Sequence, residues 1–335
     1  MTDSKSLTNY TELHGCSCKL GQQQLDNLLT NVSPQSQTQM KISIGDDAAV
    51  RQVADELCLV TSIDYFTPIV DDPYDYGRIA ACNAASDIFA TGATENLTFL
   101  AVLGLPEELD SVAESILNGI VDMAENVNGT LAGGHTILNP WPIAGASASA
   151  TVPSSAVKRV DDATPGDKLY LTKPLGTQPA MAAKRMINSE FEKTVRDSTS
   201  RQIEDIADEA VSWMTTPNNK VIETTGDSMS AVTDITGFGL RGHAKEMANK
   251  AGVGIKISEI PIIDGTVALS KLFGYGLETG ESAETSGGLL ISVCPEKTAR
   301  FEQTLSANGH YYRQIGQVVP SGGIHFVDPN IVSVK

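Results

Sequence analysis

The chain has 335 residues, 41% of them hydrophobic, and a formal net charge of −17 at neutral pH. This length suits two domains with cores of their own. Lys and Arg form no basic cluster that could neutralise nucleic-acid phosphates, and no apolar run reaches the roughly 18 residues that suggest a membrane span, so we expect neither partner. The N-terminus lacks the pattern of a signal peptide, and five scattered cysteines predict reduced thiols in a cytoplasmic protein.

Residues 1–40 are expected to form a weakly ordered, mobile arm. A short amphipathic piece at 20–29 is followed by the polar run 33–39, which is typical of a linker. Within the arm, Cys16 and Cys18 stand one residue apart, directly before Lys19. A nearby ammonium favours the thiolate, the nucleophilic and metal-binding form of cysteine. The stretch is therefore either a reactive site or an exposed pair in a loose terminus.

The region 41–157 is predicted to be a first domain with alternating strands and helices. Apolar residues that alternate or recur at helical spacing predict these elements: strands near 42–44, 58–63, 98–105 and 143–152, and helices near 77–90 and 110–127. The four residues Gly133-Gly134-His135-Thr136 are interpreted as a bare turn. Glycines in such a turn allow the backbone to approach a phosphate or ribose closely.

Turn-rich segments at 153–155 and 161–167 predict a boundary, so that a second α/β domain occupies 158–335. The elements predicted there follow the same periodicities: strands near 168–172, 255–257, 288–293 and 316–319, an amphipathic helix at 201–214, and a helix that follows 231–239 and ends near 248. This alternation favours an α/β or α+β class over an all-helical or all-β fold.

Aspartates stand at or near the ends of apolar elements in both domains, namely Asp46, Asp47, Asp64, Asp87 and Asp234. Any one of them could be only a turn or cap residue. Together they resemble the oxygen ligands that a hard divalent cation requires. Because two unit charges about 4 Å apart interact by ~4 kcal/mol at an effective dielectric near 20, such a cluster repels a nucleoside triphosphate unless Mg²⁺ bridges the two.

Two alternatives remain open at this point. The segment 237–242 fits the GxGxxG pattern of dinucleotide-binding turns, and Glu259 follows at the end of the next strand, which favours a nicotinamide-dependent oxidoreductase. Against it, Asp234 stands where an anionic pyrophosphate would approach. The other alternative is a non-enzymatic carrier that binds a metal or selenium through Cys16 and Cys18. No P-loop pattern occurs, so ATP would have to bind by other means.

Taken in order along nearly the whole chain, these motifs resemble the selenophosphate synthetases (selenide, water dikinases), of the aminoimidazole ribonucleotide synthetase-like superfamily. The stretches that carry the resemblance are 15–19, 46–50, 62–70, 77–90, 131–135, 171–176, 233–240 and 285–290. The resemblance implies a two-domain fold in which the first domains of a homodimer form a shared β-barrel, with the α/β second domains outside. It implies synthesis of selenophosphate, AMP and phosphate from selenide, ATP and water, supplying selenium for selenocysteine and selenium-modified tRNA.

The resemblance also assigns roles to residues. It implies Cys16 as the catalytic residue and Lys19 as an essential, ATP-contacting lysine. The implied Mg²⁺ ligands are Asp47, Asp87 and Asp234, and K⁺ is an implied monovalent cation. Further implied ATP contacts are Asp64, Asp87, Gly134, His135 and Thr136, together with Ile44, Gly45 and Asp46, which the family donates to the partner subunit's nucleotide.

The chain departs from the family pattern at two places. Ser17 replaces a glycine between the two cysteines, and Ser282-Ala283-Glu284 replaces Asp-Pro-Gln. Serine stays small, so we expect little effect from the first change, while the second leaves the role of that turn open. We also expect the arm to act as a lid that closes over bound ATP and brings Cys16 and Lys19 to the phosphates.

Overall fold

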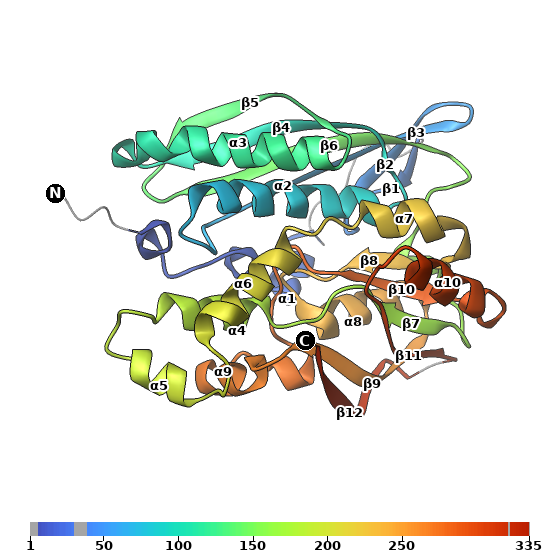
Figure 1. Ribbon diagram of the computed structural model, residues 1–335. Coiled ribbons are helices and arrows are strands. Elements are labelled where there is room, and N and C mark those ends of the chain that lie inside the picture. Colours follow the sequence, from blue (N-terminus) through green and yellow to red (C-terminus); the bar gives the residue numbers. More distant parts are fainter. Residues whose placement is uncertain (1–5, 30–38, 321, 335) are drawn as a thin grey trace.

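The computed structural model describes residues 6–29, 39–320 and 322–334. Two α/β units lie one above the other, and the N-terminal segment runs between them (Figure 1). The two-domain α/β fold expected from the sequence is confirmed. None of the helices in the described part of the chain is long and apolar enough to cross a membrane.

The first domain is one mixed sheet with two long helices on one face. Its strand order is β1-β2-β3-β6-β4-β5, and its edge strands β1 and β5 are not paired with each other, so the sheet is open within the described chain. Its elements are β1 (Met40–Ile42), β2 (Ala49–Ala54), β3 (Leu57–Phe66), α2 (Pro73–Ala90), β4 (Glu95–Leu105), α3 (Asp110–Asn126), β5 (Thr130–Leu138) and β6 (Ile143–Pro153).

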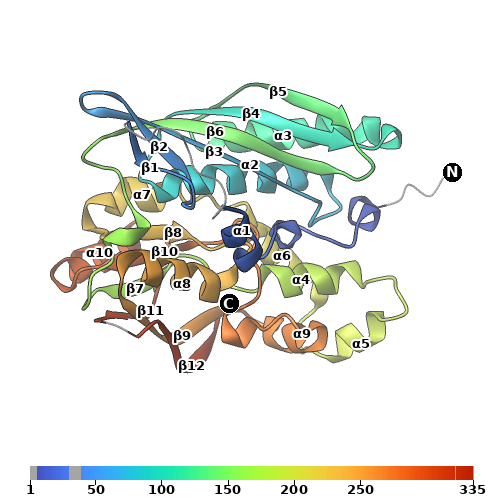
Figure 2. The ribbon, with the colours of Figure 1, turned by 180° about the vertical axis from the view of Figure 1, so that it is seen from behind.

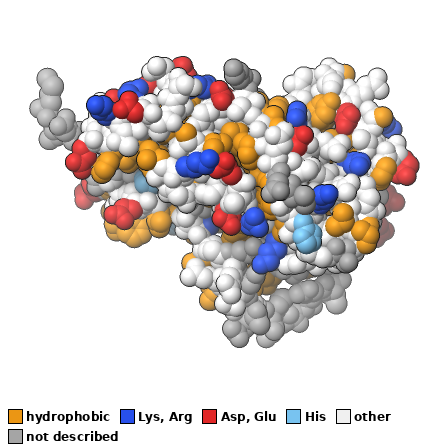
Figure 3. Space-filling view, turned by 90° about the horizontal axis from the view of Figure 1, so that it is seen from below, with side chains coloured by type: hydrophobic (Ala, Val, Ile, Leu, Met, Phe, Trp, Pro, Cys, Tyr) orange, Lys and Arg blue, Asp and Glu red, His pale blue; other side chains and the backbone are white. Residues whose placement is uncertain are grey.

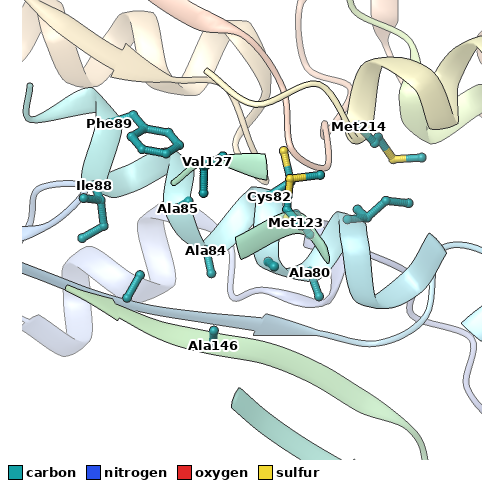
Figure 4. Close-up of a cluster of buried hydrophobic side chains, with 14 of the residues drawn as sticks. Ala80, Cys82, Ala84, Ala85, Ile88, Phe89, Met123, Val127, Ala146 and Met214 are labelled. Carbon is teal, nitrogen blue, oxygen red and sulfur yellow. The ribbon is translucent and has the colours of Figure 1, made fainter. Parts of the chain in front are cut away.

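Helix α2 occupies the centre of the molecule, between the first sheet and the second domain (Figures 1 and 2). Its small residues allow close packing on both sides: a Cβ on Gly77 would lie 2.0 Å from the Ile116 carbonyl oxygen of α3. The helix begins earlier than predicted because Asp72 accepts a hydrogen bond from the Asp75 amide and Pro73 occupies the first turn. Figure 4 shows the resulting core, in which alanines of α2 meet Met123.

The second domain is a mixed sheet of order β12-β9-β11-β7-β10-β8 with helices around it. Its strands are β7 (Lys168–Leu171), β8 (Val232–Asp234), β9 (Gly254–Ile263), β10 (Leu289–Val293), β11 (Arg313–Val319) and β12 (Ile324–Val334). Its helices are α4 (Thr177–Arg185), α5 (Glu192–Asp197), α6 (Ile203–Met214), α7 (Asn219–Thr225), α8 (Gly239–Ala251), α9 (Thr266–Phe273) and α10 (Pro295–Ala307). Figure 3 shows acidic and basic side chains interspersed on the face seen from below.

The face of the first sheet that α2 and α3 leave uncovered carries exposed apolar side chains. Ile63 of β3 and Leu100 of β4 both pair with Ser147 of β6, so they lie in one row across three strands. They are 59% and 48% exposed. Tyr65 and Ile137 are exposed as well. An exposed apolar patch of this kind marks an interaction surface.

One expectation from the sequence is wrong. The segment Gly133–Thr136 is no turn: it lies inside strand β5, which pairs in parallel with β4 at the edge of the sheet. The described part of the arm is packed between the two domains, and its mobility stays a prediction. Residues Leu7–Tyr10 and Cys16–Cys18 form short 3₁₀ helices, and α1 (Gln22–Leu29) follows them. Leu7 and Cys16 are only 3% and 1% exposed. The polar run 33–38 lies outside the described residues.

Candidate active site

Three aspartates from different elements meet where the two domains face each other. Asp47 precedes β2, Asp87 lies in the last turns of α2, and Asp234 ends β8. Each offers a carboxylate oxygen, and these oxygens lie within 4.8 Å of one another. Two hydroxyls support the cluster: Ser62 donates to Asp87 at 2.7 Å, and Thr233 donates to Asp47 at 3.1 Å.

The cluster is electrostatically unbalanced. Burial raises the pKa of each of the three carboxyls, and the mutual repulsion of the neighbouring carboxylates raises those of Asp47 and Asp87 further. Both side-chain oxygens of Asp234 are buried without a well-formed hydrogen bond among the described residues, although the Ser86 hydroxyl is near enough to oppose the rise in the pKa of this carboxyl. A buried carboxylate left without partners is costly. Carboxylate oxygens converging from several elements suit a hard divalent cation, so the site fits Mg²⁺.

The docked arm brings Lys19 to the edge of this cluster. Its Nζ lies 2.5 Å from Oδ2 of Asp64, and the same oxygen accepts a hydrogen bond from Asn83 at 2.6 Å. Burial alone would lower the pKa of Lys19, but the attraction of Cys16, once that group is ionised, and of the Asp64 carboxylate outweighs burial and raises the pKa. Lys19 therefore stays an ammonium beside the carboxylates.

Cys16 is buried in the same place, and its Sγ donates to Asn83 Oδ1 at 3.3 Å. Its backbone amide donates to Thr285 Oγ1 at 3.0 Å. Burial raises the pKa of Cys16 to about 12, and the attraction of Lys19 only partly offsets this effect. In the docked arm burial therefore favours the thiol form of Cys16, whereas the neighbouring Lys19 in the sequence predicts the thiolate. Cys18 does not line the same place: together with Tyr65 and Trp141 it lines a separate, mainly apolar pocket.

The acidic cluster forms one wall of a cavity of about 250 Å³. Leu25 and Leu29 of α1 cover it from the arm, and residues of the second domain close it. The lining residues are Lys19, Leu25, Leu29, Gly45, Asp46, Asp47, Asp87, Asp234, Thr236, Gly237, Phe238, His243 and Glu246. The cavity thus combines a cation, several carboxylates and an apolar cover.

Helix α8 ties the loop around Asp46 to the second domain. Lys250 donates to the carbonyl oxygen of Gly45 and lies 3.6 Å from Asp46 Oδ2. Its ammonium also contacts Glu246 Oε1 at 2.7 Å. Since Gly45 and Asp46 line this chain's own cavity, they are within reach of its own ligand. Their assignment to the partner subunit's nucleotide stays a prediction.

The structure does not bring the other predicted nucleotide contacts to the cavity. Gly134, His135 and Thr136 lie on β5, and the strands β4 and β6 separate them from Asp64 on β3. All three are exposed, as is Ile44, and none lines the cavity within the described chain.

The site also contains residues that the sequence motifs do not single out. Asn83 and Thr285 both hold Cys16, and His243 accepts a hydrogen bond from the Thr236 amide at 3.1 Å. Burial lowers the pKa of His243 to about 3, so this ring is neutral. Thr285 is 269 positions from Cys16, a contact that no local pattern indicates. The sequence could have indicated Asn83 as a site residue, because it lies one helical turn before Asp87 and therefore on the same face of α2.

The nicotinamide alternative loses its structural basis. Strand β8, which leads into the segment 237–242, is an edge strand that pairs antiparallel with β10, whereas a dinucleotide fold needs parallel neighbours. Gly237 faces the arm: a Cβ there would lie 2.8 Å from the Cys16 carbonyl oxygen. Glu259 is engaged by Arg313 at 2.6 Å.

Comparisons with known proteins agree with this architecture. Residues 45–152 match the family "AIR synthase related protein, N-terminal domain", and residues 164–328 match its C-terminal domain. The chain is 41% identical to the selenide, water dikinase of Methanococcus maripaludis, with 95% of this chain and 98% of that protein covered. It is 40% identical to that of Methanocaldococcus jannaschii, with 94% and 93% covered.

Solved structures with the same fold are more distant in sequence. A thiamine monophosphate kinase from Aquifex aeolicus has a TM-score of 0.67 at 20% identity and covers 92% of this chain and 97% of its own. A hydrogenase maturation protein of E. coli has a TM-score of 0.63 at 19% identity, with 79% and 81% covered. At these identities the likeness concerns the fold alone.

Proposed function

This chain belongs to the selenide, water dikinase family, and on that premise we propose that it makes selenophosphate, AMP and phosphate from selenide, ATP and water. The observation that carries the proposal is the convergence of Asp47, Asp87 and Asp234 beside Lys19. A site with this much negative charge accepts a polyphosphate only together with cations.

We assign the metal to the three aspartates. Mg²⁺ bound there would neutralise phosphate oxygens and orient the phosphate chain. The chain's own residues do the rest. Lys19 places an ammonium where charge accumulates on a transferring phosphoryl group. Leu25 and Leu29 on α1 cover the cavity and exclude bulk water while the arm is docked.

Cys16 is proposed to receive the selenium species next to the phosphates. Its thiol lies among Asn83, Asp64 and Lys19, so a soft nucleophile held there would lie close to the bound nucleotide. Proton removal from this thiol would need the arm to lift or the local charge to change, because burial keeps the docked group neutral.

A homodimer and a monovalent cation complete the proposal. The uncovered apolar face of the first sheet supports pairing with a second copy. In such a dimer, Gly134, His135 and Thr136 are candidates for contacts with ATP across the interface, since they lie at the open edge of that sheet. K⁺ rests on the family resemblance alone, and replacing K⁺ by Na⁺ in the assay tests it.

The deciding experiment is a reaction of the purified protein with selenide and Mg²⁺·ATP. AMP and phosphate are counted separately, and selenophosphate is followed by phosphorus NMR. We expect one AMP and one phosphate for each selenophosphate, and no AMP without selenide. In Cys16→Ala, AMP formation should be lost while a non-hydrolysable ATP analogue still binds. Full activity of that variant would remove Cys16 from the mechanism.

The same assay separates the proposal from a thiol carrier. A carrier that uses Cys16 and Cys18 would bind selenium or metal but consume no ATP. If the wild-type protein consumes no ATP under these conditions, the carrier is favoured and the proposed activity is refuted.

A further inference from the structure

Glu284 is a buried acidic residue to which the proposed mechanism gives no role. Only 1% of it is exposed. It lies in the segment 282–287, here called the junction loop, which leads into β10. Its carboxylate receives three hydrogen bonds at the start of α4: from the amides of Gly176 (2.8 Å) and Thr177 (2.9 Å), and from the Thr177 hydroxyl (2.5 Å).

A chain of hydrogen bonds leads from this carboxylate to the catalytic arm. The Thr177 hydroxyl, which donates to Glu284, accepts a hydrogen bond from the amide of Thr285 at 3.2 Å. The Thr285 hydroxyl in turn accepts the amide of Cys16 at 3.0 Å. The approach is close: a Cβ on Gly15 would lie 2.4 Å from Thr285 Oγ1. Thr285 is also the residue that follows Glu284 in the chain, so Glu284 is linked to the contact with Cys16 both through the backbone and through the Thr177 hydroxyl.

The junction loop also holds the thiol end of Cys16. Ser286 donates its amide to Asn83 Oδ1 at 2.8 Å, the same oxygen that the Cys16 Sγ approaches. The amide of Glu284 itself donates to the carbonyl oxygen of Thr236, two residues beyond Asp234. One loop therefore contacts the arm, helix α2 and the segment that follows the acidic cluster.

We propose that Glu284 is a positioning residue for the catalytic arm. By fixing the Thr177 hydroxyl it sets the place of Thr285, and through Thr285 it sets the place of Cys16 relative to the acidic cluster. The consequence for turnover rests on the proposed function, whereas the positioning itself does not. Without the carboxylate, the first turn of α4 loses an acceptor for three donors, and the arm loses the rigidity of its docking site.

The test measures how fast the Cys16 thiol is alkylated. Cys18 and Cys294, the cysteines of intermediate exposure, are first replaced by serine, and peptide mass spectrometry follows Cys16 apart from the buried Cys58 and Cys82. Labelling of Cys16 by iodoacetamide then reports lifting of the arm. Glu284→Ala should raise the labelling rate by about tenfold or more, the effect of losing about one well-formed hydrogen bond. Glu284→Gln keeps an acceptor at the same place and should restore most of the protection. Glu281→Ala, at a glutamate with a 59% exposed side chain three residues earlier, is the matched control.

Kinetics and a second variant separate positioning from general damage. In Glu284→Ala, kcat for selenide-dependent AMP formation should fall about tenfold, while affinity for an ATP analogue changes little. Thr285→Val removes the hydroxyl that accepts the hydrogen bond from the Cys16 amide. If Glu284→Ala does not fold, labelling and kinetics are measured on Thr285→Val instead. The effects of the two variants should not add when combined, because they break one chain of contacts.

Either of two results would overturn the proposal: Cys16 labelling in Glu284→Ala as slow as in Glu281→Ala, or additive effects of Glu284→Ala and Thr285→Val. Because alkylation requires no catalysis, a protein that makes no selenophosphate but shows the expected labelling pattern would refute the proposed function and leave the positioning role intact.

Discussion

At the scale of single residues, the site consists of groups that are unfavourable alone. Asp234 is buried without a well-formed hydrogen bond among the described residues, and Lys19 from a separate segment pairs with Asp64. Removing one of the repelling carboxylates should therefore stabilise the empty protein and weaken its ligand binding at once.

Asp234→Asn tests whether the stability of the empty protein rises while its metal binding weakens. The substitution removes one of three repelling charges, so we expect a higher melting temperature without metal and loss of most of the stabilisation that Mg²⁺ gives the wild type. Thermal unfolding with and without Mg²⁺ measures both effects. Asp227→Asn, at an exposed aspartate of the same domain, is the control. A wild-type response to Mg²⁺ in Asp234→Asn would remove this residue from the metal site.

Glu284 provides a prediction about pH. Burial raises its pKa to about 7, above the ordinary value of 4.5, so the folded protein holds a proton that the unfolded chain has released in this range. The free energy of unfolding should therefore fall as pH rises from about 4.5 to 7, by at most ~1.4 kcal/mol per pH unit. Glu284→Gln should lack this component. Melting temperatures of the wild type and Glu284→Gln are compared from pH 5 to pH 8. The wild type should lose stability relative to the variant as the pH rises to about 7, and the difference should stay constant above that pH.

The sequence was informative about residues whose role is local. Aspartates at the ends of elements could be picked out as a group, and Asp47, Asp87 and Asp234 do converge. The contacts of Thr285 and Glu284 could not be found in this way, because their partners lie 269 and 107 to 108 positions away. The pKa of Cys16 could not be predicted from the neighbouring Lys19 either, because it depends on the burial of the thiol, which the sequence does not show.

At the scale of elements, tertiary contacts hold the described part of the arm: the Gly15 amide donates to the Thr67 carbonyl oxygen, and the two residues pair as an isolated bridge. The mobility that the polar run 33–39 predicts for the arm stays a prediction. Strand β5, whose residues Gly133–Thr136 the sequence predicts to be a turn, is the element that differs from expectation. Its glycines discourage a strand locally, yet pairing with β4 imposes one.

Gly15→Ala should loosen the arm. Gly15 has φ of +56°, and a Cβ there would collide with the Thr285 hydroxyl. We expect faster tryptic cleavage after Lys19 and a smaller protective effect of an ATP analogue than in the wild type. Gly21→Ala is a matched control in the same arm, because the nearest described atom to a Cβ at that position is Gln24 Oε1 at 3.9 Å, an ordinary contact distance. Equal cleavage of the two variants would show that the docked position of Gly15 is not required.

At the scale of the whole molecule, two unlike faces of one sheet determine the arrangement. Helix α2 covers the inner face and carries Asp87 to the boundary with the second domain, where Asp234 meets it. The outer face presents Ile63 and Leu100 in one row. Periodicity predicted most of these strands and helices, whereas the open edges of the sheet follow from pairing between distant segments, which a single sequence does not specify.

Leu100→Glu tests the proposed dimer. Burying an apolar side chain of this size contributes about 1.5–3 kcal/mol, and a carboxylate placed in the same row opposes pairing of the two sheets. We expect the wild type to sediment as a dimer and the variant to shift toward monomer. Leu272→Glu, at a 41% exposed leucine of the second domain, should leave the mass unchanged. A wild-type protein that is monomeric at all concentrations would refute this interface.

The docked arm also sets a limit on timing. Leu25, Leu29 and Lys19 belong to the wall of the cavity that contains the acidic cluster, so we expect a nucleotide to enter and leave when these residues move aside. On the proposed function, exchange of ligands and chemistry would then use two different arrangements of residues 6–29. The frequency with which the arm lifts is an upper bound on turnover, and tighter docking beyond the optimum would slow the enzyme by retaining its products.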